Sequence, residues 1–224
     1  MSVEFRVLHG ADELALLPEF EEKIWGGDDE RVSVNMLVAC IEEGGMAIGA
    51  FEGERIVGSV FGFRTFDARV LHSHYMAVDA DFRRTGLGEQ LKRRQADWCL
   101  DNQVTAMRWT FDPLQLTNAH LNLNKLGALG VKYHVNHYGT LGGINGSLPS
   151  DRVTVQWELD RPRQLFSESF VLDVPVASPE EIAASAPEAL HARIAVRDAM
   201  APLLAEGWKV SAVDREARTY TLSR

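Results

Sequence analysis

The chain has 224 residues, of which 46% are hydrophobic and 25% are charged, and its formal net charge is −9. This balance is typical of globular proteins and excludes wholesale disorder, and the acidic surplus argues against sequence-independent nucleic-acid binding, which depends on clustered positive charge. No apolar run approaches the roughly 20 residues that span a bilayer, and the N-terminus shows no apolar signal core, so we expect no membrane association. Cys40 and Cys99 fit neither a CxxC pair nor a disulfide framework, and we therefore expect a cytoplasmic protein.

The first part of the chain predicts a strand, two helices and three further strands. Asp12 and Ser33 are residue types that cap helices, and Gly26-Gly27 ends the first helix after Trp25. Alternating apolar residues mark the strands, and a short Glu-Gly-Glu turn joins the second strand to the third. The expected elements are, in chain order, 3–9, 12–25, 33–40, 46–51, 55–64 and 69–78.

A loop at 79–88 leads into an amphipathic helix that carries Leu87, Leu91 and Trp98 on one stripe. A strand, a short helix and two aromatic strands are expected next, at 104–111, 117–126, 130–138 and 152–159. The pattern breaks near 160–169, so we predict two domains, 1–159 and 160–224. The second is a small α/β appendage with a strand, a helix and a hairpin, at 170–176, about 186–205, and 208–213 with 218–223.

The segment from Met76 to Gly88 joins a strand end, a glycine-containing loop and a helix start. A helix N-terminus exposes unpaired N–H groups and positive dipole charge, and glycine lets a phosphate approach that backbone. The segment lacks the Lys-Ser/Thr of a P-loop and the third glycine of a dinucleotide motif. It predicts a cradle for a ligand with several phosphates, and an ordinary helix start with a solvated basic face is the alternative. The basic residues around it are Arg83, Arg84, Lys92, Arg93 and Arg94.

Arg83-x-x-Gly86-x-Gly88, after a strand that ends at Ala77-Val78, resembles the signature of the GNAT N-acetyltransferase superfamily. The order of elements over about residues 3–159 is similar as well, and the segment from Asn118 to Gly127 resembles a later helix of that family. The wider pattern is similar to a less characterised bacterial branch that carries a C-terminal extension. The resemblance implies an α/β (α+β) fold with a mixed, mostly antiparallel, splayed sheet and flanking helices, plus the small C-terminal α/β appendage.

The resemblance also implies an acyl-CoA co-substrate, with acetyl-CoA as the first expectation. In that family the signature loop binds the pyrophosphate through backbone N–H groups, and the preceding strand pairs with the pantetheine arm. Main-chain donors near Val78 would polarise the thioester carbonyl. The residues onto which these roles carry over are Met76, Ala77, Val78, Arg83, Arg84, Thr85, Gly86, Leu87 and Gly88.

His74 is the first candidate for general base, because it lies toward the splayed end of its strand. Strand alternation would place it on one face with His72, Met76 and Val78. Asp112 ends the adjacent strand and is a candidate for a base or an anchor of the ammonium group. The alternatives are a histidine that only shapes the pocket and an ordinary Asp-Pro turn.

The helix at 117–126 would place Asn118, Asn122 and Lys125 on one polar stripe, and the resemblance makes them candidates for contacts to the CoA arm. A solvated face is the alternative. Many family members carry a tyrosine general acid where this chain has Leu123. Tyr138, or less favourably Tyr133, would replace it, unless CoA leaves as a thiolate without a dedicated acid.

The histidine spacings fit no closed zinc set, so we expect no metal. The sequence thus predicts an acyl-CoA-dependent N-acyltransferase that acts on the amine of a small molecule by direct attack in a ternary complex. The alternatives are a succinyl-CoA-dependent enzyme that acylates amino acids and a non-catalytic acyl-CoA sensor. Sharing of an edge strand leaves a homodimer open.

Overall fold

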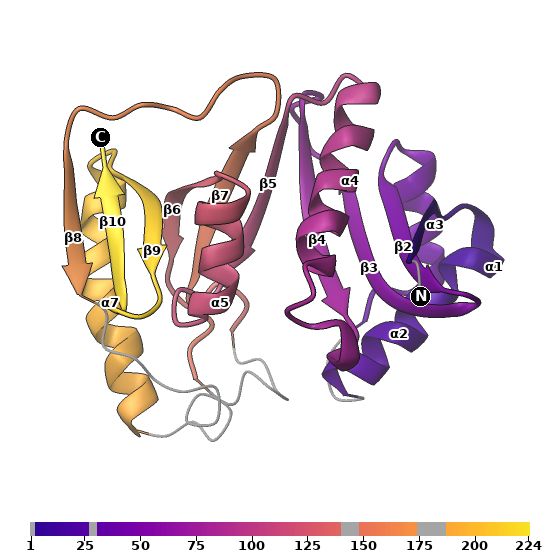
Figure 1. The fold of residues 1–224 in the computed structure, drawn as a ribbon, viewed down its shortest axis with the longest axis horizontal. Coiled ribbons are helices and arrows are strands. Elements are labelled where there is room, and N and C mark those ends of the chain that lie inside the picture. Colours follow the sequence, from indigo (N-terminus) through magenta and orange to yellow (C-terminus); the bar gives the residue numbers. More distant parts are fainter. Residues whose placement is uncertain (1–2, 27–30, 140–147, 174–186) are drawn as a thin grey trace. The chain divides into compact units, whose positions relative to one another are not determined.

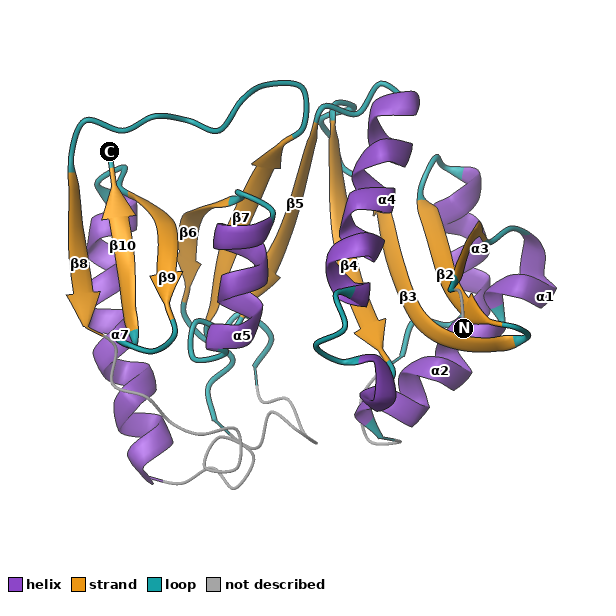
Figure 2. Cartoon of the chain, viewed as in Figure 1, coloured by secondary structure: helices purple, strands orange, loops and turns teal. Residues whose placement is uncertain are grey.

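Figure 1 shows the computed structural model of the protein, which describes residues 3–26, 31–139, 148–173 and 187–224. The chain divides into two compact units, Met1–Arg108 and Trp109–Arg224. Each unit combines a sheet of mostly antiparallel strands with helices (Figure 2), which confirms the predicted mixed fold class. Within the described ranges, no helix is both long and apolar enough to cross a membrane.

The first unit is built on five strands in the order β1-β2-β3-β4-β5. The strands β1 to β4 pair antiparallel, and β5 runs parallel to β4, with Val70–His72 opposite Ala106–Arg108. The predicted strands are confirmed, and the helix predicted at 12–25 is two helices. The elements are β1 (Glu4–Val7), α1 (Gly10–Leu14), α2 (Leu16–Trp25), α3 (Val34–Glu42), β2 (Met46–Glu52), β3 (Arg55–Arg64), β4 (Val70–Val78), the 3₁₀ turn η1 (Ala80–Phe82), α4 (Leu87–Asp101) and β5 (Ala106–Phe111), which runs on into the second unit.

Helices cover both faces of this sheet. Leucines of α1, α2 and α3 form a core with Phe51 and Phe61, and we call this side the α1–α3 face. On the opposite side, the α4 face, α4 lies along β3 and β4 (Figure 1). There Gly58 has no room for a side chain, because an added Cβ would lie 2.9 Å from Leu91 Cδ1. Glycine in this strand therefore permits the close approach of α4.

β4 contains a β-bulge at His74. Tyr75 pairs with Phe61, but the next residue of β3, Gly62, pairs with Ser73. His74 is thus one residue more than the register of β3 accommodates. Side chains alternate between faces along a regular strand, and the extra residue interrupts this alternation. Ser73 consequently points to the α4 face, whereas Tyr75 points to the α1–α3 face.

The bulge overturns one expectation from the sequence. The His74 ring lies 5.9 Å from the ring of Phe61, on the α1–α3 face. Val78 pairs with Gly58, where an added Cβ would meet Leu91 of α4, and Met76 pairs with Val60, two residues further along β3. Directly paired residues share a face of the sheet, so Met76 and Val78 lie on the α4 face. The prediction that His74 shares a face with Met76 and Val78 is therefore wrong, because simple alternation does not hold across a bulge.

The second unit has the strand order β5-β7-β6-β9-β10-β8. Gly130 of β6 lies opposite Val210 of β9, so strands after residue 160 continue the sheet of this unit. The boundary predicted near residue 160 falls inside the unit, and the division into 1–159 and 160–224 as functional domains stays a prediction. The elements are α5 (Leu116–Ala119), the π-helix η2 (His120–Lys125), β6 (Leu129–His134), β7 (Arg152–Glu158), β8 (Ser169–Asp173), α7 (Pro187–Ala205), β9 (Lys209–Asp214) and β10 (Thr219–Ser223).

Three local predictions have different outcomes. Ser33 caps α3 as predicted, because its hydroxyl accepts a hydrogen bond from the N–H of Met36. Asp12 does not cap a helix, since α1 begins at Gly10 with His9 as its N-cap. The strand predicted at 130–138 ends at His134. Most of the loop predicted at 139–150 lies outside the described residues.

Two buried carboxylates hold α7 to the rest of the second unit. Asp112 accepts two hydrogen bonds from Arg193, with N–O distances of 3.1 and 2.7 Å. Asp151 accepts two from Arg197, at 2.8 and 2.9 Å. Bidentate arginine–carboxylate pairs are among the strongest hydrogen-bonded contacts in proteins. The C-terminal extension is therefore an integral part of this unit.

Arg193→Leu should destabilise the protein by about 3–5 kcal/mol, because it leaves the buried Asp112 without its bidentate partner. Urea unfolding followed by circular dichroism measures this change. Arg161→Leu is the control, since Arg161 pairs at the surface with Glu158 and Asp160 and should cost less than about 1 kcal/mol. Equal unfolding midpoints for Arg193→Leu and the wild type would contradict the anchoring role.

Candidate functional site

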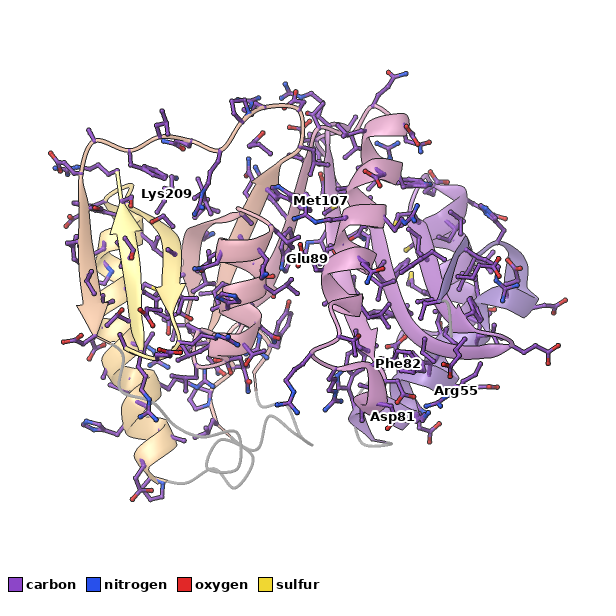
Figure 3. All side chains as sticks on the ribbon, in the orientation of Figure 1. Arg55, Asp81, Phe82, Glu89, Met107 and Lys209 are labelled. Atoms are coloured by element: carbon purple, nitrogen blue, oxygen red, sulfur yellow. The ribbon has the colours of Figure 1, made fainter. Side chains whose placement is uncertain are left out.

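A buried carboxylate fixes the end of β4. Asp79 directly follows β4, and its Oδ2 accepts hydrogen bonds from Lys23 at 2.6 Å and from Arg55 at 2.8 Å. Burial raises the pKa of Asp79, but these donors and the N–H of Asp81 outweigh burial and lower the pKa to about 2. Arg55 also reaches Asp81 at 3.2 Å, and Figure 3 shows the two side chains together. The carboxylate stays ionised at physiological pH and holds the start of the following loop.

The loop enters α4 between Phe82 and Glu89, both labelled in Figure 3. Gly86 is the N-cap residue with a φ of 91°, which favours glycine, and Arg84 has a φ of 65°. No side chain in the described ranges caps this helix, so its first N–H groups lack the partners that a cap would supply. An added Cβ at Gly86 would meet only Gln90, at 3.9 Å, so the backbone is open to a ligand. This arrangement has the chemistry of a phosphate site.

The five basic residues predicted around this cradle have different surroundings. Arg83 and Arg84 are exposed in the loop itself, where Arg83 Nε donates to the carbonyl oxygen of Val78 at 3.4 Å. The other three lie away from the loop: Arg93 pairs with Glu89, Arg94 lies over the ring of Phe5, and Lys92 is buried. The positive charge at the cradle therefore comes from Arg83, Arg84 and the dipole of α4.

His74 lies exposed at the bulge of β4. The rings of Phe61, Phe63 and Tyr75 lie 5.8–6.1 Å from its imidazole. Desolvation by these neighbours lowers the pKa of His74, so the imidazole is neutral at neutral pH and can accept a proton. In the described part of the chain, no three His, Cys, Asp or Glu side chains gather to hold a metal ion.

A buried polar chain lies on the α4 face of the same bulge. Lys92 Nζ donates to Ser73 Oγ at 2.6 Å, and Ser73 Oγ donates to Gln95 Oε1 at 2.8 Å. Gln95 Nε2 in turn donates to Met46 Sδ at 3.3 Å, so the chain links α4, β4 and β2. Lys92 is 3% exposed, and burial lowers its pKa to about 7.

A buried carboxyl lies on the α1–α3 face, where sequence reasoning did not look for one. Glu21 of α2 is 3% exposed, and its surroundings include the side chain of Tyr75. Tyr75 also interacts with Ser59, although Glu21 Oε1, Ser59 Oγ and the Tyr75 hydroxyl form no short, well-aligned hydrogen bond. Burial raises the pKa of Glu21 to about 7, against the opposing effects of Tyr75 and Arg31. The available signal was its spacing of four residues from Leu17, which puts a carboxyl on the apolar side of a helix.

Asp112 and Tyr138, the other two predicted catalytic residues, belong to the second unit. Asp112 is committed to Arg193 and also accepts the N–H of Leu114 at 2.9 Å. These contacts favour a structural anchor over a general base. Tyr138 is 48% exposed in the turn after β6, and its hydroxyl lies 3.0 Å from Thr110 Oγ1. Its role as a general acid stays a prediction.

The polar stripe predicted for the helix at 117–126 does not form. Residues 120–125 are a π-helix, in which the backbone bonds from i to i+5 and the i, i+4, i+7 spacing no longer defines one face. Asn122 is buried and accepts the indole N–H of Trp109 at 3.2 Å. Asn118 and Lys125 are exposed and stay candidates for CoA contacts.

Comparison with known proteins identifies the family. Residues 13–127 match the model of the acetyltransferase (GNAT) family. The chain belongs to the GNAT acetyltransferase family. No curated protein matches it significantly.

Solved structures of GNAT proteins have the same fold. The ribosomal-protein-S18-alanine N-acetyltransferase of Escherichia coli is 15% identical, with a TM-score of 0.59 over 72% of this chain and 96% of that one. The S5-alanine acetyltransferase of Vibrio fischeri is 14% identical, with a TM-score of 0.57 over 72% and 97%. YncA of Salmonella typhimurium, solved with its cofactor acetyl-CoA, is 17% identical, with a TM-score of 0.56 over 75% and 100%.

The stability of Glu21→Gln relative to the wild type should be higher at pH 8 than at pH 5. The pKa of Glu21 is about 7 in the fold and ordinary, 4.5, in the unfolded chain. The folded wild type binds the extra proton between these values and loses that stability as the pH rises through 7, whereas glutamine loses nothing. Thermal unfolding at both pH values measures the difference, with Glu19→Gln, at an exposed position of the same helix, as control. A difference independent of pH would contradict the raised pKa.

Proposed function

We propose that the protein is an acyl-CoA-dependent N-acyltransferase that passes an acyl group, acetyl as the first expectation, to the amine of a small molecule. The observation that carries the proposal is the start of α4. An uncapped helix N-terminus follows Gly86 at a φ of 91°, with two exposed arginines in the preceding loop. These groups suit the diphosphate of CoA, and family membership together with the acetyl-CoA-bound neighbour supports the same ligand.

The residues of the first unit suggest how the chain would promote transfer. The amine nitrogen attacks the thioester carbonyl, and main-chain donors near Val78 stabilise the oxyanion. The neutral imidazole of His74 takes the proton that the amine loses, and the C–S bond then breaks to release CoA as a thiolate. Glu21 is a second candidate for the proton acceptor, because a pKa near 7 suits a base that works at neutral pH.

The alternatives from the sequence remain distinguishable by experiment. A succinyl-CoA-dependent enzyme would prefer that donor and amino acids as acceptors. A sensor would bind acyl-CoA without releasing CoA. Two similar structures are named for an alanine of the ribosomal proteins S18 and S5. An alanine in a peptide has a free amine only at the first position, so a peptide that begins with alanine belongs in the acceptor panel. The cytoplasmic location and a homodimer stay predictions.

Thermal unfolding with CoA, acetyl-CoA and succinyl-CoA tests the proposal first. A ligand that binds only the folded protein adds about 2.7 kcal/mol to the free energy of unfolding at one hundred times its Kd, and this raises the unfolding midpoint. The donor with the largest rise is then offered with amino acids, polyamines and the alanine peptide, and CoA release is followed with a thiol reagent. No rise with any donor would overturn the proposal, and a rise without CoA release would favour the sensor.

Gly86→Ala should weaken acyl-CoA binding at least about tenfold, because alanine disfavours the left-handed backbone that shapes the cradle. Gly53→Ala is a matched control. Gly53 also has a positive φ of 62° and has no atom within 4 Å of an added Cβ, but it lies in the turn between β2 and β3. Both variants should lose about 1 kcal/mol of stability. Calorimetric titration with acetyl-CoA measures affinity, and equal affinities for the two variants would contradict the cradle.

A further inference from the structure

Lys92 contacts the bulge of β4 from the α4 face. Its Nζ lies 2.6 Å from the hydroxyl of Ser73, the residue just before His74. Opposite Ser73, Gly62 has no space for a side chain, because an added Cβ would lie 2.9 Å from the carbonyl oxygen of His72 and 3.0 Å from Gln95 Nε2. On the α4 face the bulge is thus in contact with Lys92 and Gln95, and no room is left there for a side chain at Gly62.

Burial of a lysine is unfavourable for stability, which makes its placement informative. Lys92 is 3% exposed, and desolvation disfavours its charged form. An apolar residue would fill this position on α4 without that cost. What the ammonium group adds is a donor to Ser73 at 2.6 Å and a longer contact to Gln95 Oε1 at 3.4 Å, while the single Ser73 proton goes to Gln95.

The position of the bulge decides the direction of His74. A bulge that moves by one residue along β4 would turn the intervening side chain to the other face of the sheet. The hydrogen bonds of Ser73 fix the α4 face immediately before the extra residue, so His74 emerges on the α1–α3 face beside Phe61. The same helix begins at the cradle, five residues before Lys92.

We propose that Lys92 is a positioning residue of the transferase, which pins the bulge of β4 through Ser73 and so holds His74 in its working orientation. This inference rests on the proposed function for its kinetic readout. It assigns Lys92 no contact with either substrate. The buried lysine thereby links the helix of the cradle to the strand that carries the candidate base.

Lys92→Met is the principal test. We expect kcat to fall about 10- to 100-fold, the loss typical of a misplaced catalytic group, while the Kd for acetyl-CoA changes less than about twofold. The unfolding midpoint at pH 6 should not fall, because the variant removes a buried charge. Lys209→Met, in the β9 strand of the other unit and labelled in Figure 3, is the control and should match the wild type in all three measurements.

Ser73→Ala provides a second variant that keeps Lys92. It should lower kcat by a similar factor, and the double variant should lose no more than either single one, because both remove the same contact. Hydrogen exchange at residues 73–76 gives a readout without an acceptor amine. It should accelerate at least about tenfold in Lys92→Met and stay unchanged in Lys209→Met.

Each result has a defined meaning. An unchanged kcat, or unchanged exchange at 73–76 where turnover is not found, would overturn the positioning role. Loss of kcat together with a lowered unfolding midpoint and weakened acetyl-CoA binding would also overturn it, since that is the result of general damage. Failure of the wild type to bind any acyl-CoA would instead overturn the proposed function, and the exchange experiment would still decide whether Lys92 pins the bulge.

Discussion

The extra residue in β4 sets the side-chain directions of the strand that leads to the cradle. Before the bulge, Ser73 faces α4, and after it, Tyr75 faces α2. Because of this change, a buried lysine and a buried glutamate approach neighbouring positions of one strand from opposite sides of the sheet. His74 lies between these two positions. The placement of these three side chains therefore depends on one irregularity in the pairing of β3 with β4.

The cradle could be predicted from the sequence because its determinants are local. Gly86 and the arginines before it lie in one loop between a strand and a helix, and the physics of helix termini needs only that order. The resemblance to the GNAT family rested on the same segment together with the helix from Asn118 to Gly127 and the order of elements. The bulge could not be predicted in this way, since it depends on how β3 and β4 pair, and a one-residue shift leaves the composition of both strands unchanged.

For the candidate residues of the second unit, the sequence did not indicate which contacts their side chains make. Asp112 ends a strand, where polar residues often serve function, and its sequence neighbours give no sign of Arg193. Asn122 looked like part of a polar stripe, but the π-helix and the indole of Trp109 place it inside. Burial of Lys92 was equally hidden, because charged residues are assigned to the solvent by default, whereas the spacing of Glu21 from Leu17 was a weak signal of its burial. The deciding contacts of Asp112, Asn122 and Lys92 come from other elements of the fold.

The pair of Asp112 and Arg193 spans 81 positions of the chain, and Tyr220 reaches the carbonyl of Pro113 across 107. The ribosome synthesises the residues in order, so Asp112 and Asp151 cannot form their bidentate pairs until Arg193 and Arg197 have been made. The first unit, Met1–Arg108, contains its own core and the strands β1 to β4. During synthesis the first unit, with its cradle, would therefore be able to fold before the second unit is complete. Until Arg193 has been synthesised, Asp112 lacks its bidentate partner, and a chain that stalls or is cut near residue 160 would leave the edge of β6 without β9 and open to aggregation.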